Sequence, residues 1–494
     1  MTYDEIVQGL RDSTYELENE GRLVRAGLKT EQDTAGIIER YAWLYSEEAL
    51  AVVGRPADEA QKRVRAAVFQ GIVGRRTASQ EDRLTTFYAQ ATAPVLGEQV
   101  PFHTAQAHLV TEADPRRREA LGDGIGVVMA EAEELNLELN ATVQEVIHDL
   151  GFDGYIQFWS SLKEIDYEPL QAELVRVSDA AHERYRTWVE PRMAAAGHAF
   201  GNCPQTHMPY LRSLAEHDAA FTGEGFEPAM RRTFEHLGLE LFSASTIQID
   251  LADRPSKNPR ASVYVPEAGR EVHLLTRPSG GNNDYSAFLH EAGHALHFGL
   301  SDPAIGWPLA NLGRSMAYTE LWSFLFERVG HDPAWIVEAT GVGEADAERI
   351  ASDLTGVDLM LFTRYVGKFV CELELYRGDP LDPARGQHLY VRKLNERTGF
   401  RYDPRAWQFD RDPGFYSADY LRAWMAEATL EQRLRERFGE RWWASRDAGL
   451  WLRRQWLLGS EPEAEETVAQ MGGKPWSGED LLEVLERRLP ATVR

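Results

Sequence analysis

The sequence predicts a mainly α-helical protein with one small antiparallel β-sheet. Apolar residues recur at helical spacing along most of the 494 residues, and short runs of glycine, proline and aspartate separate these segments. Segment 246–278 differs, because it is rich in β-branched residues and is interrupted by proline and glycine. This pattern is typical of about three short strands. The segment directly precedes one in which two histidines stand at helical spacing.

The helical pattern is clearest in three segments of the chain, namely 172–193, 317–330 and 419–439. Within the strand-rich segment a turn is expected near Gly269. A final capped helix is expected over 477–489. These elements suggest two lobes: a helical N-terminal lobe of residues 1–245, and a lobe of residues 246–494 with the sheet and the C-terminal helices.

Composition argues against several classes of protein. The formal net charge is −25 and the pI is near 5.1, so no broad basic surface is expected for nucleic acid or anionic lipid. No apolar stretch approaches the ~18–20 residues that cross a bilayer, and the first residues lack the pattern of a secretory signal. The two cysteines, Cys203 and Cys371, are far apart in the sequence and fit a reducing compartment. We therefore expect a soluble, cytoplasmic protein; the sequence does not indicate its oligomeric state.

The segment His290-Glu291-Ala292-Gly293-His294 predicts a metal site. Asn283 or Asp284 is expected to cap the helix that carries it, and Gly299 to end it. Histidines four residues apart project from one face of a helix, so both can bind the same ion. In the H-E-x-x-H motif the ion is Zn²⁺, and the glutamate is the general base for metal-activated water.

A catalytic zinc site usually has three protein ligands and leaves one position open. Glu320 and Glu327 lie seven residues apart on the next strong helix, so both can face the same way. We predict Glu320 as the third ligand, and Glu327 as the carboxylate that orients a histidine N–H. His297 is expected to pack in the core or to support a ligand side chain rather than to bind the metal itself. The plainest alternative is an amphipathic helix whose histidines face solvent or core, with Glu327 as an ordinary surface carboxylate.

These residues resemble the thimet oligopeptidase and oligoendopeptidase F family of zinc metallopeptidases, the gluzincins. The run from His290 to His297 looks like the zinc helix of that family, and the run from Glu320 to Glu327 matches its Glu-x-x-Ser-x-x-x-Glu element. Asp250, Arg254 and Lys257 are similar to its Asp-x-x-x-Arg-x-x-Lys region. Segment 412–421 resembles its tyrosine-rich substrate loop.

The resemblance implies a two-lobed helical body with a deep channel, one zinc ion at its floor, and short peptides as substrates. It also implies that Tyr420 or Tyr416 donates a hydrogen bond to the oxyanion. A hairpin over 263–275 could pair its edge with an extended peptide. For at least one of the two tyrosines, simple aromatic packing is the alternative.

The sequence departs from the family just before the tyrosine loop. Ala406 and Arg411 stand nearest the positions where the family has a histidine and a tyrosine, and no histidine follows His388. Arg411 or Arg422 could instead bind the terminal carboxylate of a peptide, because a guanidinium binds carboxylates bidentately. Solvated helix arginines are the alternative.

A second resemblance is to the thermostable carboxypeptidases, which share the H-E-x-x-H motif and the downstream glutamate and have a similar length. Endopeptidase and carboxypeptidase action therefore both remain open. Two further hypotheses are a zinc-containing binding or scaffold protein without turnover, and a hydrolase of a non-peptide amide or ester.

Overall fold

The computed structural model describes residues 1–489, and it is mainly helical, as the sequence predicts. Contacts divide the chain into two compact units, each assembled from separate segments. Unit 1 comprises Met1–Arg75, Ala215–Ser352 and Arg422–Leu481; unit 2 comprises Arg76–Leu214, Asp353–Leu421 and the segment from Leu482 onward. This partition differs from the lobes expected at 1–245 and 246–494, and those lobes, like the channel, stay predictions.

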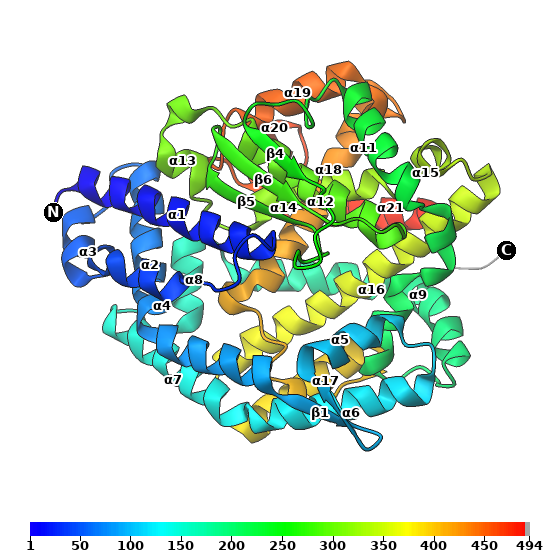
Figure 1. The fold of residues 1–494 in the computed structure, drawn as a ribbon, viewed down its shortest axis with the longest axis horizontal. Coiled ribbons are helices and arrows are strands. Elements are labelled where there is room, and N and C mark those ends of the chain that lie inside the picture. The colour runs from blue at the N-terminus through cyan, green and yellow to red at the C-terminus, as the bar shows by residue number, and fades with distance from the viewer. Residues whose placement is uncertain (490–494) are drawn as a thin grey trace. The chain divides into compact units, whose positions relative to one another are not determined.

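Unit 1 carries the sheet and the two helices of the predicted metal site (Figure 1). Its elements are α1 (Tyr3–Arg25), α2 (Thr34–Arg40), α3 (Glu47–Val53), α11 (Gly223–Leu237), β4 (Ile247–Asp250), β5 (Ser262–Glu267), β6 (Glu271–Leu275), α12 (Asn282–Gly299), α13 (Trp307–Asn311), α14 (Ala317–Val329), α15 (Pro333–Thr340), α19 (Arg446–Trp456) and α20 (Ala464–Gln470). Four helices continue from one unit into the other: α4 (Glu59–Gln90), α16 (Glu344–Tyr376), α18 (Tyr416–Phe438) and α21 (Glu479–Arg488).

The three-stranded sheet of unit 1 has the order β4-β6-β5. Strands β5 and β6 form the expected antiparallel hairpin, with Val263 opposite Leu274 and a turn at Gly269, whose φ is +73°. β4 pairs in parallel with β6, so the sheet is mixed rather than wholly antiparallel. After β4 the chain crosses to the far edge of the sheet and forms β5 there. The hairpin then brings β6 back between β4 and β5, in the direction of β4.

A buried lysine holds that connection in place. The ammonium group of Lys257 donates hydrogen bonds to the Asp250 carboxylate at 2.9 Å, to the backbone carbonyl of Asp250 at 2.7 Å and to that of Thr276 at 2.8 Å. The guanidinium of Arg254 bonds to the same carboxylate. Three residues matched to the family motif therefore fix the loop before β5.

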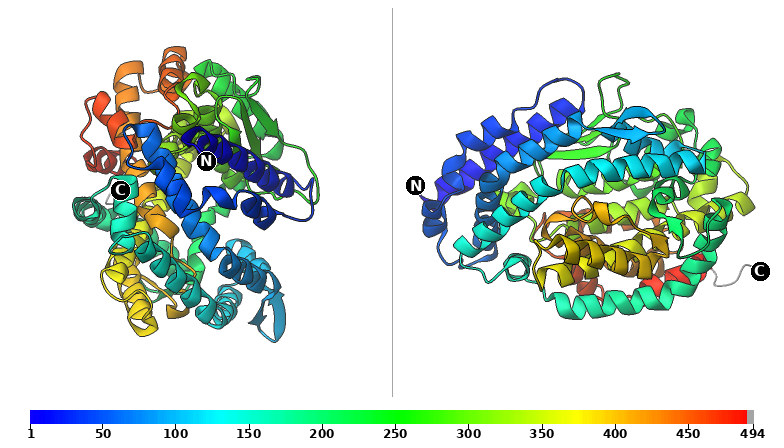
Figure 2. Two further views of the ribbon diagram at one scale, coloured as in Figure 1. Left: turned by 90° about the vertical axis from the view of Figure 1, so that its left-hand side faces the viewer. Right: turned by 90° about the horizontal axis from the view of Figure 1, so that it is seen from below.

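Helix α1 runs along β5, which is an edge strand of this sheet (Figure 1, Figure 2). A Cβ atom at Gly21 would lie 2.9 Å from the ring of Tyr264, so the glycine allows the close approach. The carboxylate of Glu18 accepts a hydrogen bond from the Val265 backbone N–H at 2.8 Å. The N-terminal helix therefore covers one side of the hairpin.

Helix α12 begins one residue before the predicted caps and ends at Gly299, as predicted. Its N-cap is Gly281, with φ +95°, and neither Asn283 nor Asp284 fills that place. The capping acceptor instead comes from another segment, because Asp218 accepts the Asn282 N–H at 2.9 Å. A cap supplied by a residue distant in sequence satisfies the first-turn donors equally well.

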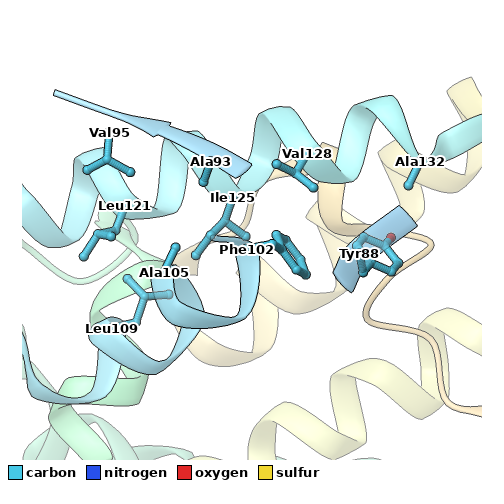
Figure 3. Close-up of a cluster of buried hydrophobic side chains, with 10 residues drawn as sticks. All are labelled: Tyr88, Ala93, Val95, Phe102, Ala105, Leu109, Leu121, Ile125, Val128 and Ala132. Atoms are coloured by element: carbon cyan, nitrogen blue, oxygen red, sulfur yellow. The ribbon is translucent and has the colours of Figure 1, made fainter. Parts of the chain in front are cut away.

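Unit 2 is built of helices with two short β-ladders, β1 with β2 and β3 with β7. Its elements are β1 (Thr92–Val95), β2 (Glu98–Pro101), α5 (Phe102–Thr111), α6 (Pro115–Glu131), α7 (Glu133–Asp149), α8 (Tyr155–Lys163), α9 (Tyr167–Ala195), β3 (Cys203–Pro204), α10 (Met208–Ser213), α17 (Pro383–Thr398) and β7 (Phe400–Arg401). Figure 3 shows part of its core, where Phe102 and Leu109 of α5 face Leu121 and Ile125 of α6.

The segments predicted as helices are helical in the structure. Residues 172–193 lie in α9, 317–330 match α14 to within a residue, and 419–439 fall in α18 to within a residue. The last expected helix is α21. In the described part of the chain, no helix is both long and apolar enough to cross a membrane.

Candidate metal centre

Two helices of unit 1 bring the three predicted ligands together. His290 and His294 lie one turn apart on α12, and Glu320 lies on α14. The Glu320 carboxylate oxygen Oε2 is 3.4 Å from Nε2 of His290 and 3.6 Å from Nε2 of His294. One ligand atom from each residue lies within 4.8 Å of the other two.

Close packing of α12 on α14 makes this approach possible. A Cβ atom at Gly293 would lie 2.3 Å from the backbone oxygen of Trp322 and 2.6 Å from Cα of Ser323. Trp322 is fully buried beside this contact. The glycine between the two histidines therefore sets how near Glu320 can come to them.

Hydrogen bonds at the outer ring nitrogens orient both histidines. Nδ1 of His290 is 2.8 Å from a carboxylate oxygen of Glu327, and Nδ1 of His294 is 2.8 Å from the hydroxyl oxygen of Thr319. When each Nδ1–H donates to its oxygen, each Nε2 keeps its lone pair free and directed at Glu320. Sequence reasoning missed Thr319, although it directly precedes Glu320.

The donor set fits a tetrahedral zinc ion. With metal–ligand bonds of about 2.0–2.1 Å, ligand atoms of a tetrahedral site lie about 3.3 Å apart. The measured separations of 3.4 and 3.6 Å are close to that value. Glu320 is only 3% exposed, and the Ser323 hydroxyl donates to its Oε2 at 2.9 Å. Two imidazole nitrogens and one buried carboxylate are the ligand chemistry of a catalytic zinc site.

The carboxylates change the protonation of one histidine. Burial disfavours the charged form of His290, but Glu320 and Glu327 outweigh burial and raise its pKa well above the ordinary value. Burial lowers the pKa of His294, and the Glu320 charge only partly opposes this. Since a metal ion would compensate the same two carboxylates, its binding would release the proton of His290.

Glu291 lies next to the first histidine and lines a cavity of about 400 Å³. His294 lines it as well, together with β5 and with Thr14 and Glu18 of α1. We refer to this space as the α1–β5 cavity. Its volume lies within the ~300–1,000 Å³ of ordinary ligand pockets. A substrate in this cavity would therefore face Glu291 directly.

The N-terminal helix also brings a cation toward Glu291. Burial lowers the pKa of Arg25, while the charges of Tyr264 and Glu291 act in the opposite direction. The guanidinium donates to the Arg260 carbonyl at 3.4 Å, and its Nε is buried without a hydrogen-bond partner. No sequence motif indicated Arg25 or Glu18, because both reach the site only through the packing of α1.

His297 contacts none of the three ligands through a hydrogen bond among the residues described. Its Nε2 lies 2.9 Å from the Gly459 carbonyl, and its ring packs against Tyr318. Burial lowers its pKa to about 3, so the ring is neutral. His297 therefore ties α12 to the chain at Gly459, and a role in supporting the ligands stays a prediction.

Tyr416 and Tyr420 lie in unit 2, at the start of α18. Their ring centroids are 4.5 Å apart, and the ring of Tyr420 is 5.4 Å from that of Tyr365. Before them, Lys163 donates to the Gly414 carbonyl at 2.5 Å and to the Asp419 carboxylate at 2.6 Å. The loop is thus firmly held, and the catalytic role of either tyrosine stays a prediction.

The structure argues against Arg422 as a substrate-binding residue. Its side chain is 2% exposed, and its guanidinium bonds to the carboxylates of Glu463 and Glu465 and to the hydroxyl of Ser315. This arginine therefore holds parts of unit 1 together.

Arg411 of unit 2 is half-buried and donates to the Gln408 side chain at 2.6 Å and to the Tyr376 hydroxyl. Ala406 is buried. The role predicted for Arg411 stays a prediction.

A second group of possible ligands lies in unit 2, but it does not fit a metal. Nε2 of His198 and Nε2 of His207 lie 3.0 and 3.3 Å from one carboxylate oxygen of Glu119. However, Nδ1 of His207 accepts a hydrogen bond from Nε of Arg118 at 3.0 Å. A neutral imidazole that accepts at Nδ1 carries its proton on Nε2, so it has no lone pair for a cation there.

The fold is shared with a group of mainly helical peptidases of known structure. PZ peptidase A, solved with an inhibitor, is 15% identical at a TM-score of 0.61, over 98% of this chain and 87% of that chain. A carboxypeptidase from Pyrococcus furiosus is 14% identical at a TM-score of 0.60, over 98% of each chain. A protein assigned as oligoendopeptidase F from Bacillus anthracis str. Ames is 14% identical at 0.57, over 96% of this chain and 82% of that one.

These likenesses confirm, at the level of the fold, both resemblances that the sequence indicated. No protein-family model matches the sequence, and no curated protein matches it significantly.

Proposed function

We propose that this protein is a zinc-dependent peptidase that hydrolyses peptide bonds in short peptides. One observation carries the proposal: both histidines direct Nε2 toward the buried Glu320 carboxylate, while their Nδ1 atoms are engaged by Glu327 and Thr319. The peptidases that share the fold support the choice of peptides as substrates.

The proposed metal ligands are His290, His294 and Glu320, with one zinc ion per chain. A bound Zn²⁺ supplies a Lewis acid that lowers the pKa of water and polarises a carbonyl group. Glu291 accepts a proton from the attacking water and later delivers it to the leaving amine. Its place in the wall of the α1–β5 cavity supports this role.

The residues around the ligands have supporting roles in this proposal. Glu327 and Thr319 fix the ring orientation and tautomer of the two histidines. Tyr420 or Tyr416 is proposed to donate a hydrogen bond to the oxyanion, as the resemblance implies. The buried, unpaired thiols of Cys203 and Cys371 agree with a reducing compartment, so we propose a cytoplasmic protein.

The decisive experiment is digestion of a mixed peptide library, read by mass spectrometry, with wild-type protein and with Glu291→Gln. We expect cleavage that a chelator abolishes and zinc restores, and we expect Glu291→Gln to bind zinc without cleaving. Full activity of that variant would disprove the mechanism. The positions of the cuts distinguish endopeptidase from carboxypeptidase action.

The alternative from another class is a zinc-containing peptide-binding or scaffold protein without turnover, favoured by the missing histidine before the tyrosine loop. In that case zinc would bind and the library would stay intact. A library that stays intact while a non-peptide amide or ester is hydrolysed would indicate the third hypothesis.

A further inference from the structure

The α1–β5 cavity contains a carboxylate that the proposed mechanism does not use. Glu18 lines the cavity together with Glu291 and His294. One of its oxygens accepts the Val265 N–H at 2.8 Å. Within residues 1–489, no lysine, arginine or histidine forms an ion pair with Glu18. A partly buried carboxylate without a cation is costly, because desolvation disfavours its charge.

The side chains around Glu18 do not compensate its negative charge. The other carboxyl side chain of the cavity is Glu291, and none of the described side chains that line the cavity is a lysine or an arginine. Among the described residues, the cation Arg25 forms no ion pair with Glu18, and its guanidinium donates to the Arg260 carbonyl at 3.4 Å. Burial raises the pKa of Glu18, against the hydrogen bond from Val265. At Glu18 the cavity therefore presents a carboxylate without a cation partner to a ligand.

A second group in the wall also lacks a partner. The hydroxyl oxygen of Ser262 is buried and has no hydrogen-bond partner among the residues described. Ser262 lies on β5 and lines the same cavity. Val263 and Val265 of β5 provide apolar wall between the polar groups. A ligand that fits must therefore carry an apolar stem and a polar, positively charged end.

We propose that Glu18 is a specificity-determining residue that selects peptides with a cationic nitrogen next to the bond that is cut. The proposal rests on the proposed peptidase function. The cationic nitrogen belongs either to a lysine or arginine side chain or to the free amino terminus of the peptide. Both are hydrogen-bond donors that pair with a carboxylate, and both would compensate the charge of Glu18.

Glu18 also has a structural role, which the test must separate from selectivity. Its hydrogen bond to Val265 occupies one backbone donor of the edge strand β5. Glu18→Gln keeps a carbonyl oxygen in place for this N–H but removes the negative charge. Asp12→Asn is the matched control, since Asp12 is an exposed carboxylate on the same helix and does not line the cavity.

The test compares kcat/KM for peptides that differ at one position beside the cleaved bond, with lysine, norleucine or glutamate there. Each peptide is made with a free and with an acetylated amino terminus. We expect the wild type to prefer a cationic peptide over its neutral counterpart by about tenfold or more, as is typical of a close charge pair. The preference should collapse in Glu18→Gln and persist in Asp12→Asn.

The pattern of preference identifies the source of the charge. A preference for lysine over norleucine assigns the cation to a side chain, and a loss on acetylation assigns it to the amino terminus. Equal cleavage of all peptides by the wild type would overturn the proposal without any substitution. A preference that survives in Glu18→Gln would overturn it as well.

A binding measurement separates this proposal from the proposed function. Calorimetry with Glu291→Gln protein gives the ratio of Kd values for lysine and norleucine peptides, with and without the second substitution Glu18→Gln. If the wild type cleaves no peptide but binding still depends on Glu18 and on the cation, the peptidase assignment fails and the selectivity stands. If the wild type cleaves peptides but binding does not depend on the charge, the peptidase assignment stands and the selectivity fails.

Discussion

At the scale of single residues, the hydrogen bond between Glu327 and His290 is directly testable. Glu327→Gln replaces an anionic acceptor for Nδ1–H by a neutral one, so His290 becomes a weaker ligand. We expect the zinc affinity to fall about 10–100-fold, which is typical when a ligand loses its supporting partner. Competition with a chromophoric chelator measures the change.

Thr319→Val should weaken zinc binding through His294 in the same way. Glu240→Gln serves as the control, because Glu240 is an exposed carboxylate outside the site. Unchanged affinity in both test variants would show that these hydrogen bonds do not support the ligands.

The tyrosines allow a second prediction at this scale. If Tyr420 donates to the oxyanion, Tyr420→Phe should lower kcat about 10²–10³-fold and change KM little. Tyr416→Phe should have a smaller effect, since the family pattern favours Tyr420. Steady-state kinetics on one good substrate from the library decides between them. If both variants keep the wild-type kcat, neither tyrosine is the donor.

Sequence reasoning predicted some of these residues and could not predict others. His290, Glu291 and His294 share one helix, so their spacing alone fixes their common face. Glu18 and Arg25 stand far from that helix in the sequence, and only tertiary packing brings them near it. The ion pairs of Arg422 with Glu463 and Glu465 could not be predicted either, because those carboxylates lie about 40 residues further along the chain.

At the scale of elements, the contact between α12 and α14 determines the shape of the metal site. Gly293→Ala would place a methyl group 2.3 Å from the Trp322 carbonyl oxygen, so the two helices must separate. We expect a loss of about 1–3 kcal/mol in the free energy of unfolding. We also expect weaker zinc binding, because Glu320 would move away from the histidines. Chemical denaturation and chelator competition measure the two effects.

A matched control exists in helix α4. Gly74 has no atom within 4 Å of an added Cβ, so Gly74→Ala should keep zinc affinity and stabilise the helix by about 0.5–1 kcal/mol. If Gly293→Ala behaves like this control, the close approach of α12 and α14 is not required.

The β-sheet shows what local patterns can and cannot predict. The β-branched residues of segment 246–278 and the turn expected near Gly269 predicted the β5–β6 hairpin, because adjacent strands joined by a short turn are antiparallel. The partner of β4 depends on where its long connection leads. That path is held by Lys257, which lies in the connection and bonds to Asp250 at the end of β4 and to Thr276 directly after β6. The parallel pairing of β4 was therefore not predictable.

At the scale of the whole molecule, stability should depend on the protonation of Glu372. Burial, helped by the charge of Asp412 and opposed by Lys368, raises its pKa to about 7 from the ordinary 4.5. Between these values the folded protein holds a proton that the unfolded chain lacks. The free energy of unfolding should therefore fall as pH rises from about 4.5 to 7, by about 3 kcal/mol from this group.

Urea denaturation at several pH values tests this contribution. Glu372→Gln cannot titrate, so its stability should fall less over the same interval than that of the wild type. Its side-chain oxygen can still accept the Asp412 N–H, which Glu372 accepts at 2.9 Å. Glu183→Gln, an exposed position on α9, should keep the wild-type slope. Equal slopes for wild type and Glu372→Gln would contradict the assignment.

The composition of the two units, each built from separate segments of the chain, could not be predicted from the sequence. The helical class follows from periodicity, because each amphipathic segment must bury one face. Unit 1, however, combines segments from the beginning, middle and end of the chain, and no local pattern indicates which segments pack together.

Helix α1 has one more consequence, which concerns association between molecules. An uncovered edge strand offers free N–H and C=O groups to any other strand and is a common starting point for aggregation. Along β5, α1 covers this edge, and Glu18 occupies the N–H of Val265. The helix that lines the cavity thus also keeps the β5 edge from pairing with a strand of another molecule. A protein in which α1 is displaced should become prone to aggregate even while its zinc ligands stay intact.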